Sequence, residues 1–551
     1  MMRKGKKVCA SMLTMSMIAA LLGGCGSPEE GGKENGSVPS SAAAEGEQET
    51  GGGSEREVFK LTVHSSPAQG DWNDYWLIHT IEEKFNVDIQ VEMISTDVWR
   101  DKLPLMFATE ELPDFFLNSL DNSDIATYGS EGYLIDLNPY ISQEATPNIW
   151  KAMEETPALR PALTEAGGEI FAVSGADMAE ANLAQNRFYV NYQWAEQILG
   201  KQPETLDEFY EYLKGVKEQD MNGNGDAADE IPLGGFYKAP DMIHVFPPIL
   251  NAFGYTRKDI EAIDGKVVYV PAEDNYKLFL DFMKKLYEEQ LLDNEFFSQT
   301  QDQVNAKETN YRYGAYAFYA SWVNQPEETI WRQYDIQEPL TSQYNSEKRT
   351  ASVDINKCGN FSITKNCSNP EKLMEILDWC FSFDGYLAIL GGFEKGTVEG
   401  QEEYGYTYEW VDDNTLDLTS DFDESKWDNK NSWSLAEVGP DYGYFPIYRN
   451  FNMQGSGDAQ SYLEEGLINH YAPYYHIGWP SSVKLTAEEA DELALISTDI
   501  QSYTDEMVTK MITGEVSTDE FENFRTGLQE RKLDRMIEIY QDAYDRWSAN
   551  Q

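Results

Sequence analysis

Residues 1–25 constrain the chain more than any other stretch. Arg3, Lys4, Lys6 and Lys7 form a positive start, and a mostly apolar run from Val8 to Leu22 follows. About 20 apolar residues are needed to cross a bilayer, so this run is too short for a membrane-spanning helix. The pattern predicts a secretory signal peptide, and the body of the chain is therefore expected to fold outside the cytoplasm.

The end of this segment, Leu22-Gly23-Gly24-Cys25, resembles the lipobox of bacterial lipoproteins. That resemblance implies a leader over residues 1–24 and a lipidated Cys25 that anchors the protein to the outer face of the cytoplasmic membrane. The alternative is an ordinary signal peptide in which Cys25 occurs by chance. Residues 25–57 contain almost nothing that could be buried, so a disordered spacer is expected there.

The composition of the remaining chain indicates a globular protein. Residues from about Val58 to Gln551 suffice for two or three domains, and 41% hydrophobic residues supply a core. The net charge of −54 becomes −58 when the four cations of the leader are removed. Such a charge disfavours nucleic acid and acidic polysaccharide and favours neutral or cationic ligands, although acidity can also serve solubility alone.

The cysteines of the body show no metal or redox spacing. Cys358, Cys367 and Cys380 remain after the leader and lipobox are set aside, and none forms a C-x-x-C pair. Cys380 follows Leu373 on an apolar helical stripe, which predicts a buried thiol. The sequence leaves open whether Cys358 and Cys367 form a disulfide.

The first part of the body has the pattern of a βαβ unit. A strand is predicted at Phe59–His64, a helix ending near Phe85, and a second strand at Val87–Met93. This order implies a parallel sheet, in which ligands lie at the carboxyl ends of the strands. Trp72 follows the first strand and is a candidate ligand contact.

Three later motifs carry a resemblance to a known family. These are Leu112-Pro113-Asp114-Phe115-Phe116, the run Gly132-Tyr-Leu-Ile-Asp-Leu-Asn-Pro-Tyr-Ile141, and the helix start Asn369-Pro370-Glu371. In this order they resemble extracellular solute-binding proteins of carbohydrate ABC transporters, within the large lipoprotein subgroup that takes oligosaccharides.

The resemblance implies an α/β, periplasmic-binding-protein type II-like fold with two lobes joined by hinge crossings. Lobe 1 would comprise residues 58–172 and 351–446. Lobe 2 would comprise residues 173–350 and the C-terminal helices of residues 447–551. The stretch from Gly400 to Trp433 is acidic and aromatic and is expected to be irregular.

Further candidate ligand residues come from aromatic and amide positions. Asn191 stands where the family commonly has Arg, and Gln193 where it has Asp, which weakens any transfer of a charged contact. Trp322 ends a predicted strand that reaches the cleft in the family, and Trp433 closes the acidic aromatic stretch. An aromatic ring offers a large apolar face to a sugar, but each of these residues could equally belong to the core.

A helix is predicted from a capping box at Thr205 and Glu208 and from the helical spacing of Leu206, Phe209, Leu213 and Val216, and the loop after it has the donors of a cation site. The candidate ligands are Asp220, Asn222, Asn224, Asp226, Asp229 and Glu230. Oxygen donors at alternate positions with Gly225 at the sixth suit calcium, but Ile231 at the twelfth position excludes a full EF-hand. A D-x-N-x-N-G loop ending in D-E-I-P also resembles the calcium site of alginate-binding relatives. A solvated acidic turn is the alternative to a structural Ca²⁺ site.

These features favour a monomeric lipoprotein that captures a neutral oligosaccharide and delivers it unchanged to ABC transporter permease subunits. A surface-tethered glycoside hydrolase, or a peptide-binding or sensor lipoprotein, is the alternative. The common hydrolase, zinc-protease and nucleotide-binding motifs do not occur in the sequence. No catalytic residue is therefore predicted.

Overall fold

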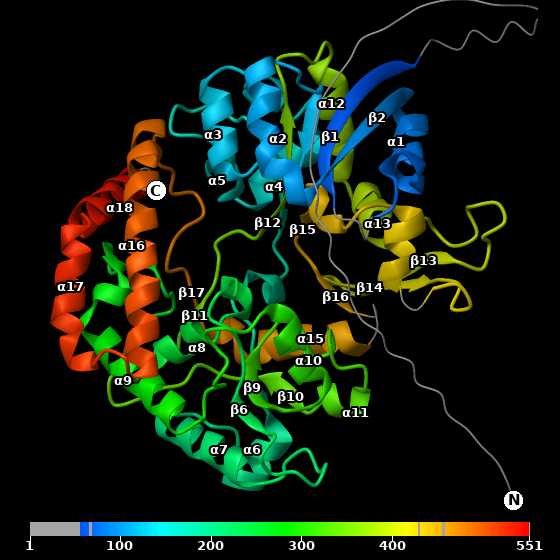
Figure 1. The fold of residues 1–551 in the computed structure, drawn as a ribbon. Coiled ribbons are helices and arrows are strands. Elements are labelled where there is room, and N and C mark those ends of the chain that lie inside the picture. Colours follow the sequence, from blue (N-terminus) through cyan, green and yellow to red (C-terminus); the bar gives the residue numbers. More distant parts are fainter. Residues whose placement is uncertain (1–55, 66–68, 428–429, 455–457, 550–551) are drawn as a thin grey trace, which may run out of the picture. The chain divides into compact units, whose positions relative to one another are not determined.

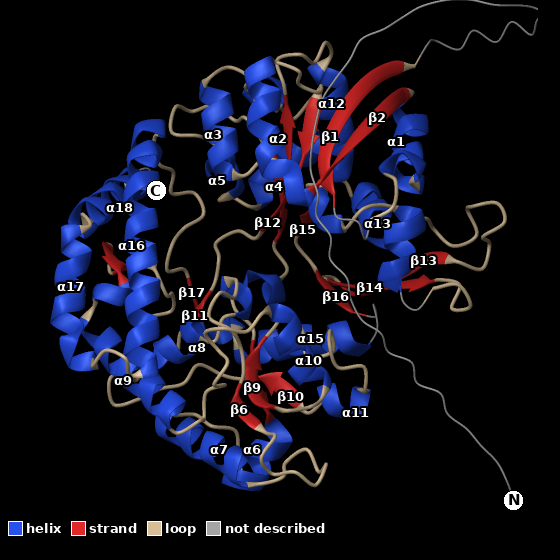
Figure 2. Cartoon of the chain, viewed as in Figure 1, coloured by secondary structure: helices blue, strands red, loops and turns tan. Residues whose placement is uncertain are grey.

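Two β-sheets with helices packed around them organise the chain in the computed structural model (Figures 1 and 2). The structure describes residues 56–65, 69–427, 430–454 and 458–549. Cys25 and the predicted leader and spacer up to residue 55 lie outside these ranges. Within them, no helix is both long enough and apolar enough to span a membrane.

The predicted βαβ unit begins the first sheet. β1 (Glu57–Ser65) and β2 (Val87–Ser95) pair in parallel along their whole length, and α1 (Trp76–Phe85) connects them. Alternate residues of β1, namely Phe59, Leu61 and Val63, are buried on one face. The parallel pairing was predicted from the order of strand, helix and strand.

The first sheet has six strands in the order β15-β4-β12-β3-β1-β2. The four strands not yet introduced are β3 (Phe115–Leu117), β4 (Val173–Asp177), β12 (Lys357–Ile363) and β15 (Tyr448–Arg449). β12 runs antiparallel to both of its neighbours, and the other pairs are parallel. The sheet is therefore mixed, and its core draws on chain segments far apart in sequence.

Helices cover both faces of this sheet. They are α2 (Thr96–Thr109), α3 (Asn122–Ser130), α4 (Pro147–Glu155), α5 (Leu159–Leu163), α12 (Pro370–Cys380) and α13 (Phe383–Gly391). The predicted apolar stripe of α12 is buried, including Cys380. Cys358 and Cys367 are both free thiols, so the disulfide that the sequence left open is not formed.

The free edge of β2 is occupied by side chains. Asn73 donates its amide to the carbonyl of Val91 and accepts the amide hydrogen of the same residue, at 3.1 and 2.9 Å. Glu82 accepts the amide hydrogen of Ile89 at 2.9 Å. These contacts satisfy backbone groups that an edge strand otherwise leaves open.

The second sheet has four strands in the order β10-β5-β9-β6. They are β5 (Phe188–Asn191), β6 (Ile231–Leu233), β9 (Tyr313–Ala317) and β10 (Tyr334–Ile336). The helices of this region are α6 (Tyr192–Leu199), α7 (Leu206–Glu218), α8 (Phe246–Leu250), α9 (Asp274–Glu288), α10 (Gln301–Thr309), α11 (Glu328–Trp331) and α15 (Asp458–His470). The capping box predicted at Thr205 and Glu208 starts α7.

Three C-terminal helices pack onto the same hydrophobic core as the second sheet. They are α16 (Ala487–Thr513), α17 (Phe521–Glu530) and α18 (Leu533–Ser548), and they contact α9 and the hairpin of β7 (Ile260–Ile263) and β8 (Lys266–Tyr269). A two-stranded pair, β11 (Thr350–Ala351) with β17 (Tyr475–His476), lies between distant parts of the chain. The C-terminal helices thus complete the core of the second sheet.

Two strands near the expected lobe boundaries, β4 and β15, are neighbours. Both β4 and β15 belong to the first sheet, and their ends are joined by a buried ion pair. The guanidinium Nε of Arg449 is 2.8 Å from Asp177 Oδ1, and the two residues are 4% and 8% exposed. A buried ion pair therefore holds the end of β4 against the end of β15.

The acidic aromatic stretch expected to be irregular forms a hairpin. β13 (Gly405–Asp412) pairs antiparallel with β14 (Thr415–Asp421), and β16 (Asn452–Gln454) pairs with β14. That expectation was wrong, because Leu416 and Leu418 alternate along β14 and bury one face of the hairpin.

Candidate functional site

Polar and aromatic side chains gather where β1 and β3 end. Ser119, just after β3, accepts the amide hydrogen of His64 at 3.1 Å and donates to the carbonyl of Leu117 at 2.9 Å. Tyr444 donates to the carbonyl of His64 at 2.9 Å. Burial, together with the charge of Arg100, lowers the pKa of His64. These carboxyl ends are where ligands lie in parallel sheets, and His64 and Tyr444 were missed because Tyr444 comes from a distant segment.

Trp72 lies beneath this surface. It is fully buried, its indole nitrogen donates to Gln69 Oε1 at 3.2 Å, and its ring meets the ring of Tyr444 edge-on at 5.1 Å. In this conformation Trp72 supports Tyr444 and presents no free face. Ligand contact by Trp72 stays a prediction.

Asn191 caps a helix. It is fully buried at the end of β5, and its Oδ1 accepts the amide hydrogen of Trp194 at 3.1 Å. Its Nδ2 donates to the hydroxyl of Tyr311 at 3.0 Å. The side chain thus starts α6, a role that Asn commonly fills before a helix.

Trp433 is also buried in this conformation. It ends α14 (Lys430–Trp433), is 2% exposed, and meets Phe393 edge-on at 5.5 Å. Its predicted ligand contact stays untested.

Trp322 differs from the other three because it is only partly buried. It lies on the loop after β9, whose residues Tyr319 and Val323 are 39% and 53% exposed. The ring of Trp322 meets Trp331 edge-on at 5.8 Å, and the guanidinium of Arg332 lies 4.7 Å above the ring of Trp331. This loop, residues 318–325, therefore exposes part of an aromatic ring that packs against Trp331.

The predicted cation loop is wound tightly around its own side chains. Asp220 accepts the amide hydrogens of Gly223 and Gly225 at 2.8 and 2.9 Å, and both glycines have positive φ. Asn222 and Asn224 accept the amide hydrogens of residues 224 and 226 at 3.0 and 2.8 Å. Asp226 accepts the amide hydrogen of Ala228 at 3.1 Å. Much of the oxygen set is thus already oriented by backbone contacts.

The end of the loop folds back onto its start. The amides of Asn222 and Asn224 donate to the two carboxylate oxygens of Asp229, at 3.2 and 3.0 Å. Glu230 is 8% exposed; its Oε1 accepts the amide hydrogen of Met221 at 2.7 Å, and its buried Oε2 has no hydrogen-bond partner. Among the described residues, no group of three or more His, Cys, Asp and Glu side chains is arranged as a metal site. The loop nevertheless holds hard oxygen donors and an unpartnered carboxylate oxygen, which is the donor chemistry that Ca²⁺ takes.

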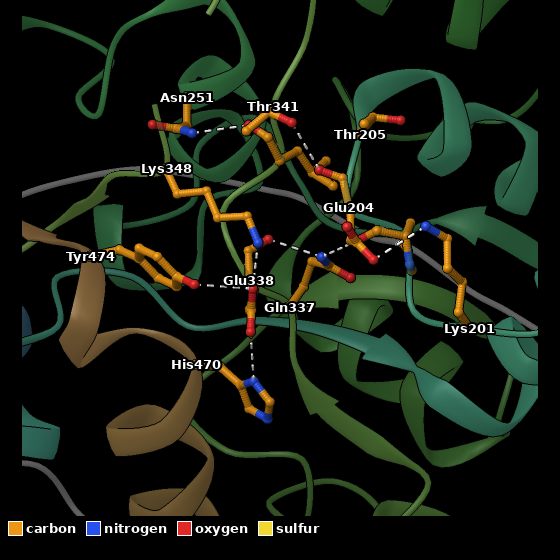
Figure 3. A network of polar contacts seen from close by, with 12 residues as sticks. Lys201, Glu204, Thr205, Asn251, Gln337, Glu338, Thr341, Lys348, His470 and Tyr474 are labelled. Atoms are coloured by element: carbon orange, nitrogen blue, oxygen red, sulfur yellow. Dashed lines mark hydrogen bonds and ion pairs between the residues drawn. The ribbon is translucent and has the colours of Figure 1, made fainter. Parts of the chain in front are cut away.

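Figure 3 shows a polar network centred on Glu338. Lys348 donates to Glu338 Oε2 at 2.5 Å, Tyr474 donates to the same oxygen at 3.4 Å, and His470 Nδ1 lies 3.5 Å from Oε1. Burial opposes ionisation of Glu338, but Lys348 and His470 outweigh it and lower its pKa, and a hydrogen bond with Asp335 raises the pKa of His470. The adjoining cavity has a volume of about 10 Å³, room for about one water. The network therefore ties the end of α15 to the segment after β10 and has no room for a solute.

A family model that matches most of the chain after the predicted spacer identifies the family. The family model of the bacterial extracellular solute-binding protein matches residues 66–385. The chain belongs to this family. The α/β fold and the prediction of a solute-binding protein rather than an enzyme are thereby confirmed, and the proteins similar to it agree.

One similar protein is the fructooligosaccharide ABC transporter substrate-binding protein FusA of Streptococcus pneumoniae serotype 4. It is 24% identical over 519 residues, which cover 90% of this chain and 91% of FusA. Lipoprotein LipO of Bacillus subtilis is 23% identical over 227 residues, covering 40% of this chain and 41% of LipO.

Solved structures agree in fold. The structure of FusA in complex with kestose has a TM-score of 0.71 at 22% identity and covers 90% of this chain and 100% of that one. The human-milk-oligosaccharide (HMO)-binding solute-binding protein of Bifidobacterium longum infantis has a TM-score of 0.74 at 18% identity, with 90% and 99% covered. A FusA EF-hand mutant in complex with fructo-nystose has also been solved, at a TM-score of 0.71, 21% identity, and 90% and 100% coverage.

Proposed function

We propose that this extracellular solute-binding protein captures a neutral oligosaccharide and passes it unchanged to the permease of an ABC transporter. The observation that carries the proposal is similarity to FusA along 90% of this chain. The net charge of −54 supports a neutral rather than an acidic saccharide, because like charges repel. Closure of the two sheet regions around the solute would be the form that the permease recognises.

Calorimetry with the purified protein tests this function. Kestose, fructo-nystose, milk oligosaccharides and an acidic galacturonan oligomer are titrated separately, and each mixture is then analysed by chromatography. We expect a neutral saccharide to bind and to be recovered intact. Release of smaller sugars, or binding of the acidic oligomer alone, would contradict the proposal.

Trp322 is the candidate ligand residue that the geometry supports best. Its partly exposed ring meets Trp331 edge-on and offers a large, rigid apolar surface to a sugar ring. Trp322→Ala should weaken binding of the saccharide by about tenfold, since ~1.4 kcal/mol corresponds to that factor. Val323→Ala, exposed on the same loop, is the matched control and should bind normally. For Trp72, Asn191 and Trp433 we propose ligand contact only in a conformation that exposes them.

A Ca²⁺ ion in the loop from Asp220 to Glu230 is the second part of the proposal. The closely spaced oxygen donors of this loop and the buried Oε2 of Glu230 support it. At a hundredfold excess over its dissociation constant, the ion would stabilise the fold by about 2.7 kcal/mol. We expect Asp220→Ala to lower the melting temperature in calcium but hardly in chelator. Glu218→Ala, an exposed change at the end of α7, should match the wild type in both.

The lipid anchor at Cys25 and a monomeric state complete the proposal. A cell producing the wild type should retain the protein in its membrane fraction, and Cys25→Ser should release it in folded form to the medium. Retention of the Cys25→Ser protein would contradict the anchor. Light scattering of the released protein measures its mass, for which 62.7 kDa is the value of the whole chain.

A further inference from the structure

Glu308 is a carboxylate enclosed by tyrosines. It lies on α10, is 4% exposed, and belongs to the side of the second sheet formed by Tyr189, Tyr313, Tyr316 and Tyr334. The ring of Tyr316 is 5.6 Å from that of Tyr189, 5.7 Å from that of Tyr313 and 5.1 Å from that of Tyr334. Few carboxylates are this deeply buried without a partner charge.

No cation balances this carboxylate within the described residues. Lys307 precedes Glu308 but binds Asp293 and Glu295 instead, both at 2.7 Å. The titratable groups that face Glu308 are the four tyrosine hydroxyls of β5, β9 and β10, and burial raises the pKa of every one above 10. The remaining neighbours are the uncharged amides of Asn324 and Gln325. Burial raises the pKa of Glu308 to about 7, and hydrogen bonds with Asn324 and Tyr316 only partly oppose this.

Glu308 and the end of α10 fasten the loop that carries Trp322. Asn324 donates its side-chain amide to Glu308 Oε2 at 2.7 Å. Gln325 donates to the carbonyls of Glu308 and Thr309 at 3.4 and 3.3 Å, and Thr309 donates to the carbonyl of Asn324 at 2.8 Å. Asn324 is two residues from Trp322, so a change at Glu308 reaches the aromatic surface of this loop directly.

We propose that Glu308 is a positioning residue for solute binding: its protonated carboxyl holds the loop of residues 318–325 in place, and its ionisation loosens that loop. The proposal rests on the proposed function, because it assigns the solute contact to Trp322. The sign follows from linkage. A buried carboxyl in the packed arrangement holds its proton more tightly than the same carboxyl in a loosened, hydrated arrangement. Lowering the pH therefore favours the packed loop, and raising the pH through about 7 favours the loosened one.

Fluorine NMR tests this coupling without any ligand. The protein is labelled with 5-fluorotryptophan, and the signal of Trp322 among the 13 tryptophans is the one that Trp322→Phe removes. In the wild type we expect this signal to titrate between pH 5.5 and 8.5. In Glu308→Gln, which keeps an oxygen to accept from Asn324, it should not move. A histidine side chain can titrate near neutral pH in any protein, so the comparison with Glu308→Gln is what assigns the change.

Two further variants sharpen the result. Asp302→Asn, an exposed change on the same helix, should titrate like the wild type. Asn324→Leu should abolish the response of Trp322 while leaving Glu308 in place. A wild-type signal that does not titrate, or a titration that persists in Glu308→Gln, would overturn the proposal. A cooperative thermal transition of Glu308→Gln at pH 5.5, at a melting temperature no lower than that of the wild type, shows that the variant folds.

Affinity supplies the second readout. Binding of kestose by the wild type should weaken about fivefold from pH 6 to pH 8.5, whereas Glu308→Gln should bind equally at both. If no saccharide binds at any pH, the proposed function fails, and the fluorine titration still decides the role of Glu308. Equal pH dependence of affinity in the two proteins would count against that role.

Discussion

Two buried carboxylates, one in each sheet region, have different surroundings. In the first sheet, Asp177 faces the guanidinium of Arg449, and both residues are deeply buried. Beside the second sheet, Glu308 is also deeply buried, but among the described residues its neighbours are amides and tyrosine hydroxyls. A balanced pair resists pH changes near neutrality, whereas a lone carboxyl with a raised pKa responds to them. The buried pair is therefore expected to act as a constant contact, and Glu308 as a contact that changes with conditions.

The largest effect is expected from breaking the balanced pair. Asp177→Ala leaves the buried guanidinium of Arg449 without its partner, which costs about 3–5 kcal/mol of unfolding free energy. Lys151→Ala, which removes one side of an exposed pair with Glu155, should cost less than ~0.5 kcal/mol. Urea denaturation of both variants checks this. Similar losses in the two would mean that the buried pair contributes no more than a surface one.

The next effect is a pH dependence of the free energy of unfolding that Glu308 causes. Because the pKa of Glu308 is raised to about 7 in the folded protein, its contribution favours the fold below the unfolded-state pKa and is lost as the pH rises through 7. At pH 8.5, Glu308→Gln should be more stable than the wild type, by on the order of 3 kcal/mol, and the two should converge below about pH 4, under the unfolded-state pKa. Denaturation at several pH values measures the difference. Asp302→Asn should follow the wild type throughout.

The smallest effect concerns the tyrosine hydroxyls of the second sheet. Tyr334 donates to the carbonyl of Tyr313 at 2.6 Å, so Tyr334→Phe should cost about 1 kcal/mol. The buried hydroxyl of Tyr189 has no hydrogen-bond partner among the residues that the structure describes, and Tyr189→Phe should be nearly neutral. Thermal denaturation of Tyr334→Phe and Tyr189→Phe measures the two losses of stability. Equal costs would show that the hydroxyl of Tyr189 is satisfied by water.

Local order was predictable where short-range signals agree. The sequence predicted a helix ending at Phe85 and a strand beginning at Val87, and both ends are correct. Asn86 between them adopts a positive φ of 54°, a conformation that Asn tolerates better than most residues. The hairpin at 405–421 was missed because its aromatic and acidic composition hid the alternation of its buried positions.

The candidate ligand site was harder to predict because burial depends on distant partners. Trp72 follows the first strand as expected, but Tyr444 covers it, and nothing near Trp72 in sequence indicates that contact. Asn191 carries the local signal of a helix cap, whereas its bond to Tyr311 does not show in the pattern. Glu308 lies four residues after Val304 on the buried face of its helix, which is the one signal that could have identified it.

The side chain of Asn73 gives the first sheet a closed border. By taking both backbone groups of Val91, it occupies the place where a strand from a second molecule would add to β2. An open border of this kind would let copies of the protein add strand to strand and stack into aggregates. One asparagine thus helps the molecules to remain separate.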